Sequence, residues 1–280
     1  MTTSVLVPDS LTREAEDRRE ATRKLGYVAR AATVFQVDRL TVFPDPDGAG
    51  KWEDGFVETV LRYAATPPHL RKGMWGKRDE LESVGVLPPL RVRSQTGSGS
   101  EGSGSLRQGI VTEVGADGRV RVNCGMQHPI SLPVPDGMDV GARERVTVRV
   151  SSRRPVRAKL VDAPISGFDV VSADLDGALS RDDAGLTIAS SRYGELATTR
   201  RLGDLAQRRD AEGGLTVAFG APERGLPSIL DVDPDAVGDQ HNDESTGFDL
   251  WLNTVPNQGS EVVRTEEAMF ASLACLTLTE

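Results

Sequence analysis

Two loops near the end of the chain combine residue types that suit a small-molecule site. FGAPERGL (Phe219–Leu226) and NTVPNQGSEVVRT (Asn253–Thr265) each follow a short apolar run. Glycine allows the backbone to approach a ligand closely, and proline stiffens a loop. A single glycine is more simply interpreted as an ordinary turn. Two such loops in this order instead indicate a ligand site at the carboxyl ends of the strands of an α/β protein.

Alternating strands and helices are predicted to position these loops. Short apolar runs predict strands at residues 4–8, 39–43, 168–173, 186–190, 215–220 and 248–253. A charged helix should begin near Leu11, capped by Asp9 or Ser10, and break at Gly26 before a second helix over 27–37. Further helices are predicted over 52–66 and 197–210.

The closing helix has the clearest signals. Thr265 is its expected cap, and Glu266 and Glu267 place negative charge in the first turn, where it suits the helix dipole. Its core face is expected to consist of Met269, Phe270, Leu273 and Leu276.

The middle of the chain differs in character. Short strands are predicted in RQGIVTEVG, GRVRVNCG, ERVTVRVSS and VRAKLVD, with turns between them and no long helix. Such a run of short strands is typical of a small β-barrel, for which the OB fold is the natural candidate. We therefore expect an α/β domain over residues 1–85 and 164–280, interrupted by a barrel over 86–163. The Gly/Ser-rich stretch Ser94–Ser105 should be a loop of this barrel.

The composition of the chain indicates the cellular compartment and the partners that we expect for the protein. The formal net charge is −9 with only five lysines, which indicates a salt-adapted cytoplasm, or alternatively an acidic protein that avoids nucleic acid. The sequence has no apolar run long enough to span a membrane, and its N-terminus lacks the apolar core of a signal peptide. Cys124 and Cys275 lack metal-site spacing and are interpreted as buried thiols, so we expect a cytoplasmic protein without a metal.

Basic residues are clustered in two segments of this acidic chain. The first segment surrounds Trp75. Its cations could contact the phosphates of a nucleic acid, and the Trp75 ring could stack on a base. The alternative interpretation is a solvated turn. The residues of this first segment are His69, Arg71, Lys72, Lys77 and Arg78. The second lies on the predicted barrel and favours RNA binding, chiefly through Arg119, Arg121, Arg143 and Arg145.

Several longer motifs point to a known family. VARAATVFQVDRLTVF, TPPHLRKGMW, VGVLPPL, TIASSRYGE, AFGAPERGL and NTVPNQGSEVVRTEEA occur in this order across nearly the whole chain. Together they resemble the SPOUT (SpoU–TrmD) RNA methyltransferases, in the archaeal and eukaryotic family that carries an inserted OB-like domain. The resemblance implies a trefoil-knotted α/β domain, a homodimer with composite active sites, S-adenosylmethionine as methyl donor and RNA as substrate. Ribosomal RNA is the expected substrate, with a base such as uridine N3 as the methylated position.

The same resemblance implies site residues. Arg30, within Ala-Arg-Ala-Ala, and Glu223 are the expected catalytic residues, with a surface salt bridge and a solvated loop carboxylate as alternatives. Arg264 could bind the cofactor carboxylate, a phosphate or the neighbouring subunit. The expected cofactor-binding residues are Ser190, Phe219, Gly220, Pro222, Gly225, Leu226, Leu252, Asn253, Pro256, Asn257, Gln258, Gly259, Arg264 and Thr265.

Methyl transfer from a sulfonium to a uridine nitrogen needs an aligned nucleophile and loss of its proton. A base or a cation that stabilises the anion would help, and a metal is not strictly needed. Two other functions remain open: a SPOUT enzyme that methylates a protein side chain, and a non-catalytic RNA-binding protein that retains the fold.

Overall fold

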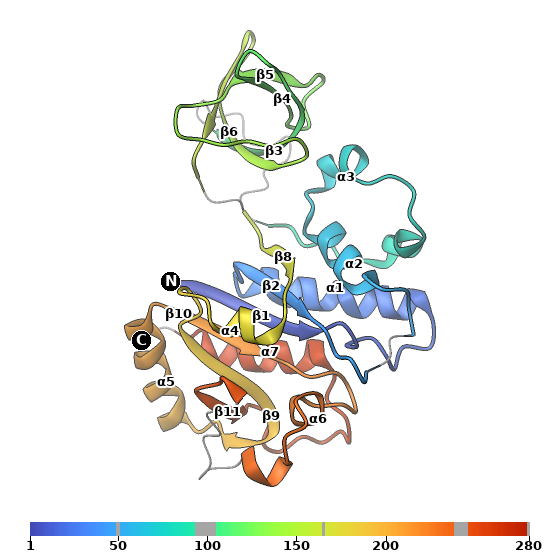
Figure 1. The fold of residues 1–280 in the computed structure, drawn as a ribbon, viewed down its shortest axis with the longest axis vertical. Helices are drawn as coiled ribbons and strands as arrows, with labels where there is room; N and C mark the ends of the chain where they lie inside the picture. Colours follow the sequence, from blue (N-terminus) through green and yellow to red (C-terminus); the bar gives the residue numbers. More distant parts are fainter. Residues whose placement is uncertain (49–50, 93–104, 164–165, 238–245, 279–280) are drawn as a thin grey trace. The chain divides into compact units, whose positions relative to one another are not determined.

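The computed structural model describes residues 1–48, 51–92, 105–163, 166–237 and 246–278. The chain forms two compact units (Figure 1). The larger unit contains Met1–Ala64, Glu80–Pro89 and Phe168–Glu280, and the smaller contains Ala65–Asp79 and Leu90–Gly167. Nearly all of the Gly/Ser-rich stretch lies outside the described residues.

A six-stranded parallel sheet forms the centre of the larger unit. Its order is β11-β9-β10-β1-β2-β8. The strands are β1 (Thr2–Pro8), β2 (Arg39–Phe43), β8 (Asp169–Ser172), β9 (Leu186–Leu196), β10 (Gly214–Ala218) and β11 (Leu250–Asn253). Val5, Leu6 and Val7 of β1 are all 0% exposed, because helices cover both faces of the sheet.

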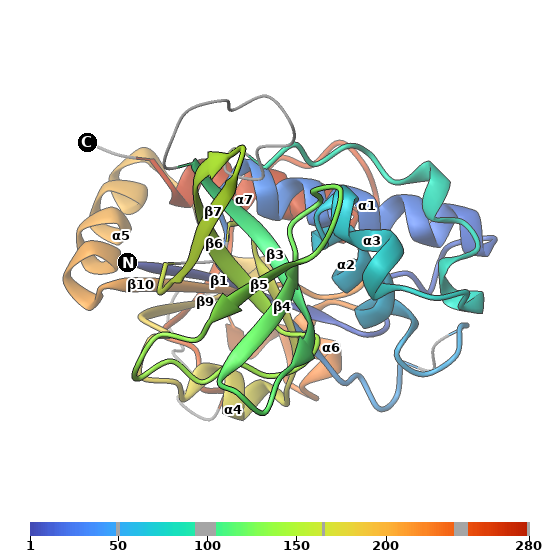
Figure 2. The same ribbon diagram turned by 90° about the horizontal axis from the view of Figure 1, so that it is seen from above.

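The helices divide between these two faces (Figure 2). α1 (Arg18–Val34), α5 (Thr199–Glu212) and α7 (Thr265–Leu276) pack together on one face. α4 (Leu175–Leu179), α6 (Leu226–Ile229) and the short turn η3 (Pro234–Val237) enclose an apolar cluster on the other. The unit also contains α2 (Phe56–Ala65, except for its last residue) and the turns η1 (Asp79–Leu81, from Glu80 on) and η2 (Val84–Val86).

The expected first helix is wrong in its start and in its break. The residues after Pro8 form turns, and α1 begins only after Asp17, whose Oδ1 accepts a hydrogen bond from Glu20 N at 2.7 Å. Gly26 lies inside α1, because the missing Cβ lets η2 approach: a Cβ there would lie 2.5 Å from Pro88 Cδ. Close packing thus explains a glycine that the sequence pattern suggested as a helix breaker.

The closing helix begins one residue earlier than expected. Arg264, not Thr265, occupies the cap position, and Glu267 Oε2 accepts a hydrogen bond from Arg264 N at 2.9 Å. Thr265 is the first helical residue. Met269, Leu273 and Leu276 are buried as expected, while Phe270 is half-buried and meets the ring of Phe35 edge-on, with centroids 6.0 Å apart.

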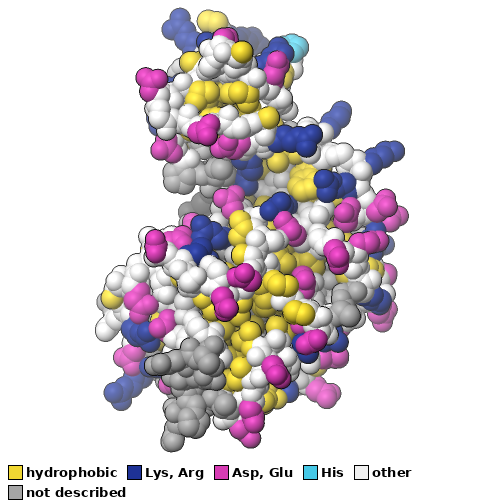
Figure 3. Space-filling view, viewed as in Figure 1, with side chains coloured by type: hydrophobic (Ala, Val, Ile, Leu, Met, Phe, Trp, Pro, Cys, Tyr) yellow, Lys and Arg dark blue, Asp and Glu magenta, His cyan; other side chains and the backbone are white. Residues whose placement is uncertain are grey.

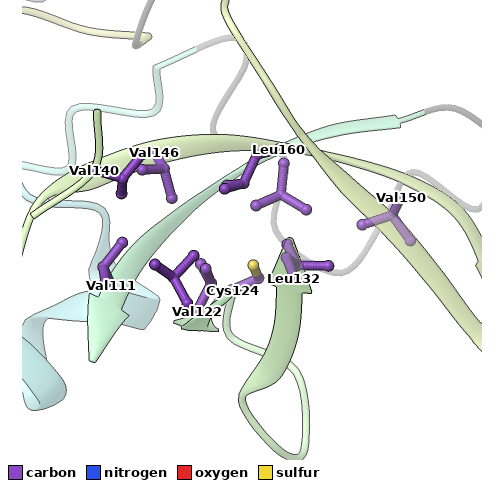
Figure 4. Close-up of a cluster of buried hydrophobic side chains, with 10 residues drawn as sticks. Val111, Val122, Cys124, Leu132, Val140, Val146, Val150 and Leu160 are labelled. Carbon is purple, nitrogen blue, oxygen red and sulfur yellow. The ribbon is translucent and has the colours of Figure 1, made fainter. Parts of the chain in front are cut away.

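The smaller unit contains a five-stranded antiparallel sheet of order β5-β4-β3-β6-β7, and its edge strands β5 and β7 approach each other so that the barrel is nearly closed. The strands are β3 (Ser105–Val114), β4 (Arg119–Asn123), β5 (Ile130–Pro133), β6 (Arg145–Arg153) and β7 (Val156–Val161), and the unit includes α3 (Pro68–Met74). Valines and leucines from these strands point toward one another inside it (Figure 4).

Cys124 lies in this interior, and burial raises the pKa of its thiol to about 12. It is therefore protonated and packs as a small apolar side chain. Cys275 is also free and is half-buried. No helix among the described residues is long and apolar enough to cross a membrane.

Candidate cofactor pocket and its loops

A pocket of about 200 Å³ lies at the carboxyl edge of the parallel sheet, in the larger unit. Most of the lining comes from three segments: the middle of β9, and the ends of β10 and β11 with the segments that follow them. The lining residues are Ser190, Ser191, Arg192, Tyr193, Phe219, Gly220, Ala221, Glu223, Gly225, Pro227, Ser228, Pro234, Asn253, Thr254, Val255, Gln258, Glu261, Val262, Val263, Thr265 and Ala268.

The loop after β10 is a tight turn. Arg224 N donates to Ala221 O at 3.1 Å, and Ala221 N donates to Arg224 O at 2.9 Å. Pro222 occupies the second position of the turn, and Glu223, in the third, has a φ of 62°. Residues other than glycine rarely adopt this conformation, at a cost of about 1–2 kcal/mol. The turn holds the exposed Glu223 at the pocket wall.

Gly220 is required for this loop to close. A Cβ on Gly220 would lie 2.6 Å from Leu226 N and 2.7 Å from Gly225 Cα. By contrast, a Cβ on Gly225 would meet Pro227 Cδ at an ordinary 3.5 Å, and one on Gly259 would meet nothing within 4 Å. Close packing within the protein therefore requires glycine at Gly220 but not at Gly225 or Gly259.

An ion pair fastens the same loop to the end of β2. Arg224 Nε donates to both carboxylate oxygens of Asp45, at 3.1 and 3.0 Å, and Ser10 Oγ donates to Asp45 Oδ2 at 2.6 Å. The Asp45 side chain is 0% exposed and that of Arg224 is 18% exposed. The hydrogen bonds from Ser10 and Arg224 compensate the buried charge and link the loops after β1, β2 and β10.

Side-chain hydrogen bonds organise the loop after β11. Asn253 Nδ2 donates to Arg192 O at 2.9 Å, and Asn253 Oδ1 accepts from Val255 N at 3.0 Å. Gln258 Nε2 donates to the carbonyl oxygens of Ser260 and Glu261 at 2.9 and 3.2 Å. These polar groups shape the loop, so their presence at the pocket does not by itself make them ligand contacts.

The two loops meet where α7 begins. Thr265 Oγ1 donates to Gly220 O at 2.8 Å, which joins the loop after β11 to the loop after β10. The fully buried Ser272 of α7 also contacts Thr254 Oγ1 at 2.7 Å. Because α7 contacts both loops, its first turns form the floor of the pocket.

Charged side chains are buried where α7 lies beside α1. The Lys24 side chain of α1 is only 4% exposed and forms ion pairs with Glu14 and Glu20. Glu266, the second residue of α7, is 7% exposed, and this burial raises the pKa of its carboxyl. Attraction to Lys24 partly offsets that increase.

The structure brings together only some of the predicted cofactor residues. Those that line the pocket are Ser190, Phe219, Gly220, Gly225, Asn253, Gln258 and Thr265, together with Glu223. Leu226 and Leu252 are buried in the core, at 0% and 1% exposure. Pro222, Pro256, Asn257, Gly259 and Arg264 belong to the loops but not to the lining residues.

Arg30, an expected catalytic residue, does not lie at the pocket. It occupies the last part of α1, and its Nη1 donates to Pro89 O at 3.5 Å. α1 starts at the carboxyl edge of the sheet and runs back along it, so Arg30 lies about 18 Å along the helix axis from Arg18, at 1.5 Å per residue. It is not among the residues that line the pocket.

Sequence analysis did not identify three pocket residues that lie within β9. The predicted strand ended at Ser190, and Ser191, Arg192 and Tyr193 were quoted only as part of a longer motif. The sequence nonetheless contained a signal: a polar segment that ends at Gly194 follows the buried run Leu186–Ala189, as in the two loops after β10 and β11.

The predicted RNA-binding residues lie in the smaller unit, several of them with intramolecular partners. His69 Nε2 lies 3.2 Å from Gln108 O, and Trp75 Nε1 donates to Thr66 Oγ1 at 3.0 Å. Arg71 Nε donates to Thr66 O at 3.0 Å, and Arg145 Nη2 donates to Gln108 Oε1 at 2.8 Å. Lys72, Lys77, Arg119, Arg121 and Arg143 are exposed. Acidic and basic side chains are interspersed on the face in Figure 3.

The fold and the pocket define a class. A parallel α/β domain that folds two glycine- and proline-containing loops over a pocket at its carboxyl edge is typical of proteins that bind small molecules. The model of the family described as "Putative RNA methyltransferase" matches residues 2–276, and the chain belongs to this family.

Individual relatives span the whole chain. An uncharacterized protein of Haloarcula marismortui is 89% identical over all of both chains. The 28S rRNA (uridine-N(3))-methyltransferase of Mus musculus is 29% identical over 98% of this chain and 76% of its own length. The Homo sapiens protein of the same name is 29% identical over 98% of this chain and 77% of its own length.

Proposed function

We propose that the protein transfers a methyl group from S-adenosylmethionine to N3 of a uridine in ribosomal RNA. The observation that carries this proposal is the pocket that both loops enclose at the carboxyl edge of the sheet. Membership of the RNA methyltransferase family supports the reaction class. The mouse and human relatives, named for uridine N3 methylation of 28S rRNA, support the choice of base and atom.

The pocket chemistry fits S-adenosylmethionine. Phe219, Val262 and Val263 offer apolar surface to a nucleoside, and the loop backbone offers donors and acceptors. The carboxylates of Glu223 and Glu261 line the pocket and complement a positive sulfonium. The bound cofactor would supply an electrophilic methyl group. Among the described residues, no group of His, Cys, Asp and Glu side chains could hold a metal, and independence from metals remains a prediction.

The residues of the chain would prepare the nucleophile. Uridine N3 must lose its proton, and Glu223 is our candidate base because the turn fixes its position at the pocket wall. We further propose the SPOUT knot for the segment from β10 to α7, supported by the Thr265–Gly220 contact between the two loops. The OB fold is our proposal for the nearly closed barrel.

Mass spectrometry of rRNA nucleosides tests the function. Cells that lack the gene should lose 3-methyluridine from one rRNA position, and the purified protein with S-adenosylmethionine should restore it on rRNA from those cells. Unchanged rRNA modification, with label instead in a ribosomal protein, would identify a protein methyltransferase. Failure to bind S-adenosylmethionine at all would leave a non-catalytic RNA-binding protein.

Arg30 is expected to act from a second copy of the chain, because it does not line the pocket of its own copy. Arg30→Ala should keep the affinity for S-adenosylhomocysteine within about threefold and lower methyl transfer by about a hundredfold, as for loss of one charge-stabilising group. Calorimetry and transfer to rRNA from deletion cells measure the two quantities. Equal transfer rates would make Arg30 a structural residue.

The composite site also requires a dimer. Tyr27 and Val34 of α1 are each 45% exposed and provide apolar surface for such a contact. Light scattering that reports only monomer, at high salt and micromolar concentration, would contradict the composite site.

The basic side chains of the barrel are expected to bind RNA. Arg145 is left out of the variant because it is half-buried and donates a hydrogen bond to the buried Gln108, which gives it a structural role. Replacing the exposed Arg119, Arg121 and Arg143 together by Gln should weaken RNA binding and lower the slope of log affinity against log salt by about 2–3, since fewer counterions are released. S-adenosylhomocysteine affinity is the control and should stay constant. An unchanged slope would make this a solvated surface.

A further inference from the structure

The segment Ser190–Gly194 leaves the parallel ladder inside β9. Trp251 of β11 pairs with Ala189, but the next residue, Leu252, pairs with Glu195, so the register shifts across this segment. The residues between these pairs project beyond the carboxyl edge of the sheet. Four of them line the pocket: Ser190, Ser191, Arg192 and Tyr193.

Three contacts fix the shape of this projection. A Cβ on Gly194 would lie 2.6 Å from Leu252 N, so only glycine fits where the chain returns to the sheet. Asn253 Nδ2 holds Arg192 O at 2.9 Å, and Tyr193 N donates to Ser191 Oγ at 3.2 Å. The backbone that carries Arg192 and Tyr193 is thus held at both ends.

The two side chains form a pair at the pocket wall. The Arg192 guanidinium carbon lies 4.9 Å from the Tyr193 ring centroid, and Arg192 Nη2 donates to Tyr193 Oη at 2.8 Å. Both residues are exposed, and Tyr193 retains 42% of its surface. The exposed Tyr193 ring, with the Arg192 guanidinium over it and bonded to its hydroxyl, offers a flat apolar surface next to a fixed positive charge.

We propose that Arg192 and Tyr193 form the platform for the target uracil. The Tyr193 ring stacks on the base, which is turned out of its strand, and the Arg192 guanidinium faces the base carbonyl oxygens. This assignment rests on the proposed uridine N3 methylation and adds the residues that recognise the base.

The platform accounts for the charge that develops during transfer. The N3 proton passes to Glu223, and its electron pair leaves a negative charge shared between N3 and the two carbonyl oxygens of the ring. N3 then forms a bond to the methyl carbon as the bond from that carbon to sulfur breaks, and the sulfur takes the electron pair. Arg192 stays protonated and stabilises the anion throughout.

The other titratable groups that line the pocket are Glu223, Glu261 and Tyr193 itself, among the described residues. Neither carboxylate can stabilise an anion while it is charged. Arg192 is therefore the pocket-lining cation of this chain that can lower the pKa of the uracil N3–H group.

The experiment compares variants on rRNA from deletion cells, with 3-methyluridine as the product. Tyr193→Ala should lower kcat/KM for rRNA by about tenfold or more, because stacking of one base contributes about 1–3 kcal/mol. Tyr193→Phe keeps the ring and should stay within about threefold. Arg192→Gln should lower kcat by about a hundredfold and move the rising limb of the pH–rate profile to higher pH, since N3 would then lose its proton less readily.

Matched controls separate the alternatives. Arg200→Gln removes an exposed arginine of α5 outside the pocket and should behave as wild type. S-adenosylhomocysteine affinity should stay within about threefold in every variant. If Arg192→Gln only raises KM and flattens the salt dependence, Arg192 contacts phosphate and the platform is rejected.

Three further outcomes would also overturn the platform. Loss of S-adenosylhomocysteine binding in Tyr193→Ala would assign the projection to the cofactor site. Wild-type activity in both Tyr193→Ala and Arg192→Gln would reject the platform while the proposed function stands. If the wild-type protein forms no 3-methyluridine, the proposed function fails and the platform fails with it.

Discussion

Gly220→Ala should lower the affinity for S-adenosylhomocysteine by at least about a hundredfold, or about 2.7 kcal/mol. The added methyl group would lie within 2.6–2.8 Å of backbone atoms of Gly225 and Leu226. These atoms cannot move without opening the turn that holds Glu223 and separating Gly220 O from Thr265 Oγ1. One methyl group would therefore disturb both loops of the pocket.

Gly259→Ala is the matched control for this prediction. A Cβ there would meet nothing within 4 Å, so the affinity should stay within about threefold. Isothermal calorimetry measures both variants, and circular dichroism checks that each is folded. Equal affinity of the folded Gly220→Ala variant and the wild type would show that this turn does not form the cofactor site.

Arg224→Ala should destabilise the larger unit by about 2 kcal/mol and weaken cofactor binding. Removal of the guanidinium leaves the Asp45 carboxylate buried with Ser10 Oγ as its remaining side-chain donor. Loss of one partner from a fully buried ion pair costs about 3–5 kcal/mol, and the 18% exposure of Arg224 reduces that cost. The loop would also lose its attachment to the end of β2.

Urea unfolding, followed by a probe in the larger unit, measures this effect. Arg208→Ala is the control, because its ion pairs with Glu212 and Asp249 join side chains that are each at least about a third exposed, and each pair should contribute less than about 1 kcal/mol. Adding Asp45→Asn to Arg224→Ala should recover part of the loss, since no unpaired charge then remains buried. Strictly additive losses in the double variant would contradict a coupled pair.

The sequence predicted the strands of the larger unit well, because most of them contain a short apolar run that is buried on both faces of the sheet. The loops after β10 and β11 could also be identified from the sequence, because glycine and proline mark the point where a buried apolar run ends. The sequence placed the start of α1 incorrectly, because the expected caps Asp9 and Ser10 instead form hydrogen bonds with the distant Asp45.

The remaining errors concern contacts between segments that are distant in sequence. Gly26 suggested a helix end, but its reason lies at Pro88. Likewise, the contact of Arg145 with Gln108 and that of Arg224 with Asp45 join side chains that no local pattern relates. The projection after Ala189 was missed because a register shift depends on the neighbouring strand.

The position of β1 in the sheet has a consequence for synthesis of the chain. β1 is made before the other strands of the sheet, yet it pairs on one side with β10, whose residues 214–218 are made much later. Until those residues leave the ribosome, the apolar β1 has an open edge, and such edges promote aggregation. We therefore expect nascent chains that stop before residue 214 to bind chaperones, and the sheet to be completed only after synthesis of β10.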